Sequence, residues 1–181
     1  MLSIVRSVIR NLYLMQVRDN GISASDYAKL YPGEKRMLER KGKKYFLTPQ
    51  KRKRLKVVLT GGVFDVIHIG HVLALSEAAK LGNVLVVVVA RDEFIRKKGR
   101  KPLHNQKYRA AIVGAMRMVN LAVPGAKDMT ETLRRVKPDV IAYGYDQKPI
   151  FKPKGVKVVK LRAHANPNSA NTSKIIEKVG I

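Results

Sequence analysis

Cysteine is missing from this chain, and long apolar runs and acidic residues are scarce. The absence of cysteine among 181 residues excludes a disulfide framework, a thiolate zinc site and a cysteine nucleophile, and it fits a cytoplasmic protein. The longest apolar run, residues 84–90, is far too short to span a membrane. Residues 1–15 contain arginines within their apolar pattern and lack a small-residue cleavage site, so they predict a helix rather than a signal peptide.

The shortage of acidic residues leaves the chain strongly basic. Lysine and arginine number 37 against 13 aspartates and glutamates, a formal net charge of +24. Residues 1–56 hold 15 basic and 4 acidic residues, so their charge density is about twice that of the remainder. Such charge attracts nucleotides, nucleic acid or an acidic membrane. A lysine-rich, solubilising surface of a thermophilic protein would look the same, so charge alone does not choose between these interpretations.

From residue 55 onward the sequence alternates strand patterns with helix patterns. Strands are predicted over 55–60, 83–90, 119–123, 139–143 and 156–161, and helices over 69–81, 92–97, 106–118, 129–136 and 173–179. The run 83–90 is apolar without alternation, as in strands covered on both faces. We therefore expect an α/β fold with a Rossmann-like, doubly wound, five-stranded parallel sheet over residues 55–181. Ligands of such sheets bind beyond the carboxyl ends of the strands.

Residues 1–54 predict a small, mostly helical N-terminal domain. The expected elements are a helix over 3–18 with Ile4, Val8, Leu12 and Met15 on one face, a helix capped by Ser23 or Ser25 and running to Tyr31, a third helix over 32–42, and a hairpin strand over 44–49. This order resembles a winged helix-turn-helix module. The resemblance leaves two roles open, nucleic-acid binding as a regulator, and packing or dimerisation.

The most informative stretch runs from Thr60 to His71 and reads Thr-Gly-Gly-Val-Phe-Asp-Val-Ile-His-Ile-Gly-His. Its two glycines after a strand allow tight turns and the close approach of a ligand. The helix expected from residue 69 directs its free N–H groups at the loop, where a phosphate would bind. His68 and His71 flank Gly70 at this end and can donate hydrogen bonds to phosphate oxygens. The alternative, that both histidines only cap the helix, fits this combined pattern less well.

This stretch resembles the cytidylyltransferase-like nucleotidyltransferases, whose signature is a strand followed by G-x-F-D-x-x-H-x-G-H. The resemblance covers residues 55–181, and residues 86–92, 98–102, 144–147 and 172–176 are similar to archaeal FAD synthetases. It implies in-line transfer of a nucleoside monophosphate from a nucleoside triphosphate to a phosphorylated acceptor, with Mg²⁺ or another divalent cation. A class I aminoacyl-tRNA synthetase also carries H-I-G-H, but this chain lacks its length and its K-M-S-K-S element.

The resemblance also assigns a role to each matching residue. Catalysis is expected of His68, His71, Lys101 and Ser173; nucleotide binding of Gly61, Gly62, Val63, Phe64, Asp65, Gly70, Asp146, Thr172 and Lys174; and acceptor binding of Arg109 and Arg117. No protein metal ligand is expected. Ser173 could instead be an ordinary helix cap, and the two arginines, eight apart on one predicted helix, could be solvated charges.

Two substrate pairs are compatible with these motifs. ATP and FMN, which give FAD, are preferred, and Tyr108 or Tyr145 could form an apolar shelf for the flavin ring. The alternative is CTP with glycerol phosphate or a similar phosphoalcohol. A homodimer and a nucleic-acid partner for the N-terminal domain are left open.

Overall fold

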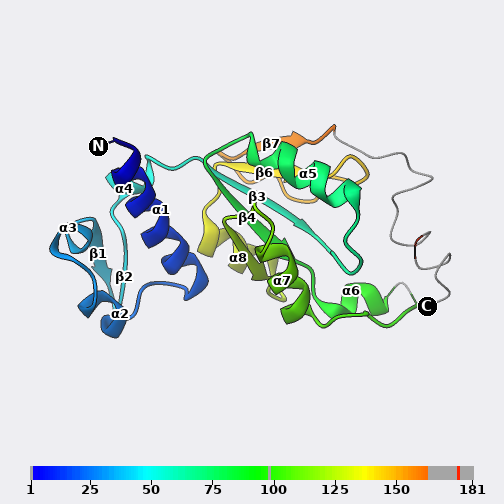
Figure 1. Ribbon diagram of the computed structural model, residues 1–181, viewed down its shortest axis with the longest axis horizontal. Helices are drawn as coiled ribbons and strands as arrows, with labels where there is room; N and C mark the ends of the chain where they lie inside the picture. Colours follow the sequence, from blue (N-terminus) through cyan, green and yellow to red (C-terminus); the bar gives the residue numbers. More distant parts are fainter. Residues whose placement is uncertain (1, 98, 163–174, 176–181) are drawn as a thin grey trace. The chain divides into compact units, whose positions relative to one another are not determined.

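The computed structural model describes residues 2–97, 99–162 and 175 and divides into two compact units, residues 1–56 and 57–181 (Figure 1). This division falls two residues from the boundary that composition predicts. The predicted helix over 173–179 lies outside the described residues, apart from residue 175. No described helix is long and apolar enough to cross a membrane.

A five-stranded parallel sheet forms the centre of the second unit, with the order β5-β4-β3-β6-β7. Its strands are β3 (Val57–Gly62), β4 (Val84–Val89), β5 (Leu121–Pro124), β6 (Val140–Tyr143) and β7 (Lys157–Lys160). Central β3 pairs with β4 on one side and with β6 on the other, so the strand order reverses between β3 and β6. This arrangement confirms the predicted Rossmann-like fold, and the reversal point is where such sheets bind ligands.

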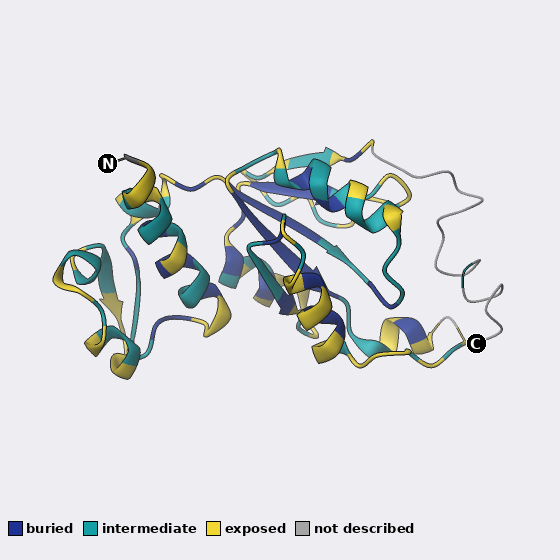
Figure 2. Cartoon of the chain, in the orientation of Figure 1, coloured by how far each residue is buried: buried dark blue, intermediate teal, exposed yellow. Residues whose placement is uncertain are grey.

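Four described helices accompany this sheet: α5 (Ile69–Ala79), α6 (Asp92–Arg96), α7 (Gln106–Gly114) and α8 (Met129–Val136). Leu75 of α5 and Val113 of α7 belong to one core cluster with Val58 and Val87, so both helices cover the same face. All six residues of β4 are buried, and Figure 2 shows β3 and β4 dark along most of their length. Burial on both faces is why this strand lacks a polar alternation.

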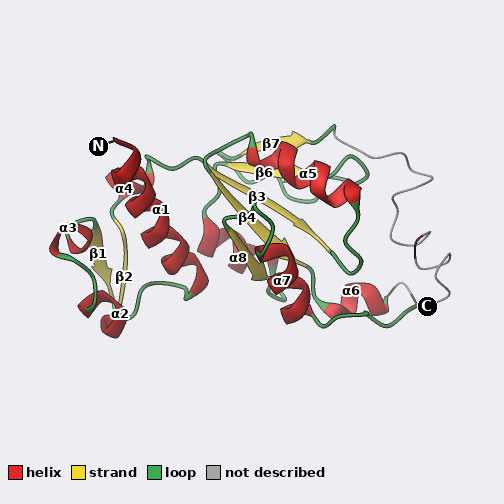
Figure 3. Ribbon diagram, viewed as in Figure 1, coloured by secondary structure: helices red, strands yellow, loops and turns green. Residues whose placement is uncertain are grey.

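The first unit consists of α1 (Leu2–Arg18), α2 (Ala24–Ala28), α3 (Pro32–Lys35), β1 (Leu38–Lys41), β2 (Lys44–Leu47) and α4 (Pro49–Arg52) (Figure 3). Ser23 caps α2 by accepting a hydrogen bond from the backbone N–H of Asp26, as predicted. The buried face of α1 is rotated from the predicted one. It presents Ile9, Tyr13 and Val17 in addition to Leu12, whereas Ile4 is 70% exposed.

Three helix predictions are wrong in extent. The helix expected to run to Tyr31 ends at Ala28. The helix expected over 32–42 ends at Lys35, and residues 38–41 pair with β2 in an antiparallel hairpin. Its two-residue loop begins with Gly42, whose φ of 61° suits the first position of such a turn. The helix expected over 106–118 ends at Gly114, so Arg117 lies beyond it and does not share a helical face with Arg109.

Candidate functional site

The glycine loop after β3 is closely packed. A Cβ atom on Gly61 would lie 3.1 Å from the backbone oxygen of Val88, and one on Gly62 would lie 2.9 Å from the ring of Phe64. Phe64 itself has a left-handed backbone with φ of 53°, and its buried ring lies 5.0 Å from the His71 ring. The glycines therefore allow the loop to fold over Phe64, which supports one of the predicted catalytic histidines.

His68 and His71 meet at the start of α5. Their ring centroids are 3.9 Å apart, and the backbone N–H of His68 donates to Nδ1 of His71 at 3.4 Å. Nδ1 of His71 is thus an acceptor, so the proton of its neutral imidazole resides on Nε2. The structure brings the two predicted histidines together with one N–H of His71 left for a ligand.

Burial keeps both imidazoles neutral. It lowers the pKa of His71 to about 4, and the neighbouring His68 acts in the same direction. Burial also lowers the pKa of His68, although the negative charge of Asp146 partly opposes this shift. Nδ1 of His68 is buried without a hydrogen-bond partner among the described residues. Buried polar atoms are normally satisfied, so this atom marks a place where a ligand or water is expected.

Asp65 anchors the basic loop, residues 99–104, to the glycine loop. Its buried carboxylate pairs with the Arg100 guanidinium and accepts the backbone N–H groups of Leu103 at 3.0 Å and His104 at 3.4 Å. Lys101 is exposed and follows Arg100 directly, so this anchor holds it near the glycine loop. These contacts give Asp65 a role in orienting the loop, and its predicted contact with the nucleotide stays a prediction.

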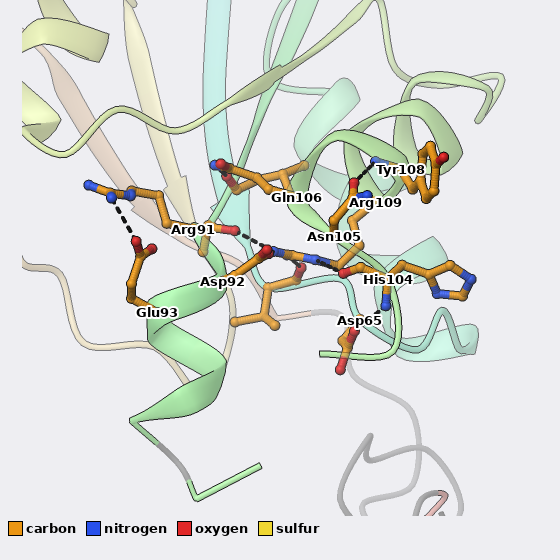
Figure 4. Close-up of polar contacts among 12 residues, drawn as sticks. Asp65, Arg91, Asp92, Glu93, His104, Asn105, Gln106, Tyr108 and Arg109 are labelled. Carbon is orange, nitrogen blue, oxygen red and sulfur yellow. Dashed lines mark hydrogen bonds and ion pairs between the residues drawn. The ribbon is translucent and has the colours of Figure 1, made fainter. Parts of the chain in front are cut away.

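Arg109 requires a correction to the predicted acceptor site. Its side chain is completely buried and pairs with Asp92 at 2.6 Å (Figure 4). The guanidinium also donates to the backbone oxygens of Val63, Ala90 and His104. Because its donors are turned to the protein and its surface is inaccessible, Arg109 cannot bind an acceptor phosphate as described. Arg117 is exposed and stays an untested prediction.

The loop after β6 completes the site at the strand reversal. The backbone N–H of Gly144 donates to Oε1 of Gln147 at 2.9 Å, and Nε2 of Gln147 donates to the Gly61 oxygen at 3.2 Å. The same loop carries Asp146, whose charge acts on His68. The sequence analysis assigns no role to Gln147, although it belongs to the stretch 144–147 and directly follows Asp146.

Several expectations receive no structural test. Thr172, Ser173 and Lys174 lie outside the described residues. Tyr108 and Tyr145 are exposed, which leaves a role as a flavin shelf a prediction. No group of three or more histidines and carboxylates able to hold a metal occurs within the described ranges, and the Asp65 carboxylate is already engaged by Arg100. We therefore derive no step from a protein-bound cation, and the expected Mg²⁺ stays a prediction.

Comparisons with known proteins agree with this geometry. A family model described as cytidylyltransferase-like matches residues 59–177. A protein named FAD synthase from Aciduliprofundum boonei is 43% identical over 132 residues, which cover 67% of this chain and 89% of that protein. Another FAD synthase, from Thermococcus kodakarensis, is 39% identical over 143 residues, covering 72% and 95%. A solved structure titled lipopolysaccharide core biosynthesis protein from Thermoplasma volcanium GSS1 is 38% identical, with a TM-score of 0.56 and coverage of 61% of this chain and 99% of that one.

Proposed function

Because the chain belongs to the cytidylyltransferase-like family, we propose that it transfers the adenylyl group of ATP to FMN, which forms FAD and releases pyrophosphate. The observation that carries the choice of these substrates is the similarity to relatives named FAD synthase, which extends over about nine tenths of their length. The chain is thus a nucleotidyltransferase, and FMN and ATP are the substrates that we propose for it.

The reaction requires little proton chemistry from the protein. A phosphate oxygen of FMN attacks the α-phosphorus of ATP, a new P–O bond forms, and the bond to the β-phosphate oxygen breaks as pyrophosphate leaves with its electrons. A phosphate monoester has its second pKa near ~6, so it is already an ionised nucleophile at neutral pH. Catalysis then depends on positioning the two phosphates and on stabilising the charge that develops between them.

The histidine pair suits this second task. Near neutral pH each imidazole is uncharged, because burial lowers the pKa of both His68 and His71. A neutral imidazole donates one hydrogen bond, and Nε2 of His71 is the donor left by the contact at Nδ1. At the N-terminal end of α5, such a donor would act together with the free N–H groups of the helix on the α-phosphate oxygens.

The basic loop suits the positioning task. Asp65 holds Arg100 and the backbone of residues 103 and 104, and this anchor leaves Lys101 exposed beside the glycine loop. A lysine on an anchored loop can neutralise phosphate charge as the triphosphate binds. A divalent cation would bind chiefly through the triphosphate oxygens, which is common for Mg²⁺ with nucleotide substrates.

The test is a direct assay for the product. We expect the purified protein to convert FMN and ATP to FAD in the presence of Mg²⁺, as measured by chromatography with flavin detection. Lys101→Gln should lower the rate about tenfold or more, whereas Lys154→Gln, an exposed lysine outside the site, should leave the rate unchanged. Pyrophosphate release from CTP and glycerol phosphate, with no FAD formed, would contradict the proposal and favour the cytidylyltransferase alternative.

A further inference from the structure

The first unit carries a concentration of positive charge that adenylyl transfer in the second unit does not use. Between Arg40 and Lys56 there are nine basic residues and no acidic residue in 17 positions. This stretch runs from the end of β1 through the loop at Gly42, β2 and α4, so the charge belongs to one connected part of the first unit.

Each acidic residue of this unit already has a partner, and one of these partners, Lys41, belongs to the basic stretch. Asp19 pairs with Arg18 and Asp26 with Lys29. Glu34 accepts the backbone N–H of Tyr31, and Glu39 pairs with Lys41 at 2.8 Å. With 15 basic residues against these four, the unit retains an excess of +11 that its own carboxylates cannot neutralise.

Two of the cations have structural roles. The Lys44 ammonium donates to the backbone oxygens of Asp19 and Asn20, just beyond the end of α1. The Arg52 guanidinium lies 5.3 Å from the centre of the Tyr13 ring and donates to the oxygen of Leu55. These contacts hold the hairpin and α4 against α1. They do not involve Arg40, Lys41 or Lys43.

The hairpin tip, which we define as Arg40, Lys41 and Lys43, faces solvent. All three residues are exposed around Gly42. Among the described residues, Arg40 Nε donates to the Gly42 oxygen beside it, and the Lys43 side chain has no hydrogen bond or ion pair there. A narrow two-stranded ribbon thus ends in three exposed cations, of which Lys41 pairs with Glu39 and the other two have no acidic partner among the described residues.

From this geometry we propose that the hairpin tip binds duplex DNA, with its cations on the phosphates that border a groove. The major groove of B-form DNA is about 12 Å wide and admits a two-stranded β-ribbon, whereas the major groove of an RNA duplex is deep and narrow. The binding is independent of base sequence, since lysine and arginine contacts to phosphates carry no sequence information.

The aromatic and apolar residues of the unit disfavour other polyanions. Single strands are bound on exposed aromatic platforms, on which successive bases stack. Here Tyr13 is buried, Tyr27 and Tyr45 stack on each other at 3.7 Å, and among the described residues of this unit Tyr31 alone is an exposed aromatic residue. Membrane-surface binding requires an exposed apolar face, but Ile4 and Tyr31 are the large hydrophobic residues exposed among the described positions of this unit. They lie on different elements, so neither partner has a prepared surface.

The experiment uses the full chain and a fluorescent 20-base-pair DNA duplex, with binding followed by anisotropy across a salt series. The triple variant Arg40→Gln, Lys41→Gln, Lys43→Gln should weaken binding at least about tenfold at low salt and reduce the slope of log K against log salt by about 2 to 3. A matched triple variant in the second unit, Lys80→Gln, Lys154→Gln, Lys160→Gln, removes the same charge from exposed positions and should retain the affinity.

Several results would overturn the proposal. The first is the absence of binding to the DNA duplex at 50 mM salt, and the second is an equal loss of affinity in the two triple variants. The third is tighter binding to single-stranded DNA, to an RNA duplex or to phosphatidylserine vesicles than to the DNA duplex. Thermal unfolding checks that each variant is folded. Lys43→Gln alone, which removes no hydrogen bond or ion pair found among the described residues, should reduce the salt slope by about 1. None of these measurements involves ATP or FMN, so their outcome is separable from that of the FAD assay.

Discussion

Arginine has opposite surroundings in the two units. In the second unit, Arg109 is completely buried and its guanidinium joins the chain after β3, the chain after β4 and the loop before α7. In the first unit, Arg40 lies exposed at a hairpin tip, and its side chain donates to a backbone oxygen two residues away. Arg109 therefore stabilises the protein's own loops, whereas the charge of Arg40 is exposed to solvent.

Net charge therefore does not show where positive charge acts in this protein. The two units have similar excess charge, but the second unit is more than twice as long. In the second unit, Arg100 and Arg109 pair with the carboxylates of Asp65 and Asp92. An exposed cation contributes little to stability in high-dielectric water, whereas a buried one must be fully paired. The comparison can be tested by removing cations of each kind.

The largest effect on the free energy of unfolding is expected from replacing Arg109. Replacing it with methionine leaves the Asp92 carboxylate and three backbone oxygens without their donor, so the free energy of unfolding should fall by about 3–5 kcal/mol in urea titrations. Arg117→Met, at an exposed position, should change it by about 0.5 kcal/mol or less. A loss below about 1 kcal/mol for Arg109→Met would show that the buried network is dispensable.

The histidine pair should affect rate more than stability. His68→Ala or His71→Ala should lower the turnover of FAD formation about 10²-fold, because each variant removes a donor at the developing phosphate charge. Lys80→Gln, at the far end of the same helix, serves as the control and should keep normal turnover. Thermal unfolding of the variants separates a catalytic loss from a folding defect, and near-normal turnover in both histidine variants would contradict the assigned site.

A smaller effect is expected from pH. The folded-state pKa of His71 is lowered to about 4 from 6.5, so between these values the unfolded chain binds a proton that the folded chain does not. Stability is therefore full above about pH 6.5 and falls as the pH decreases toward 4, by about 2 kcal/mol after allowance for partial solvent screening. Urea titrations at several pH values should show this fall, and His71→Asn should make it shallower.

The smallest effect is expected at the hairpin tip. Arg40→Gln and Lys43→Gln should each change the free energy of unfolding by about 0.5 kcal/mol or less, because exposed charges contribute little to folding. Urea titration at low and high salt provides the measurement. A larger loss at either position would mean that these cations stabilise the first unit, and it would remove the contrast with Arg109.

The sequence was most informative where burial on both sides dictates composition. The strand predicted over 83–90, found at residues 84–89, is apolar without alternation because a central parallel strand is covered on both faces. The positions of His68 and His71 at a helix start were also predictable, since a strand, two glycines and a helix leave little freedom between them. These features rest on local patterns, which a single sequence displays.

The missed features depend on partners distant in sequence. Residues 38–41 became a strand because β2 pairs with them, although their composition of leucine, glutamate, arginine and lysine also suits a helix. The burial of Arg109 depends on Asp92 and on backbone oxygens that come from three loops. No periodicity in the sequence distinguishes such an arginine from a solvated one on the same helix.

The anchoring of the basic loop by Asp65 has a consequence for ligand affinity. Flexible loops lose conformational entropy when they close on a ligand, and this loss weakens the observed binding. In this protein the Asp65 carboxylate already holds Arg100 and the backbone of residues 103 and 104, so the ordering of that segment takes place during folding. A nucleotide arriving at the glycine loop then meets a loop whose shape is set, and its binding energy remains for aligning the reacting phosphates.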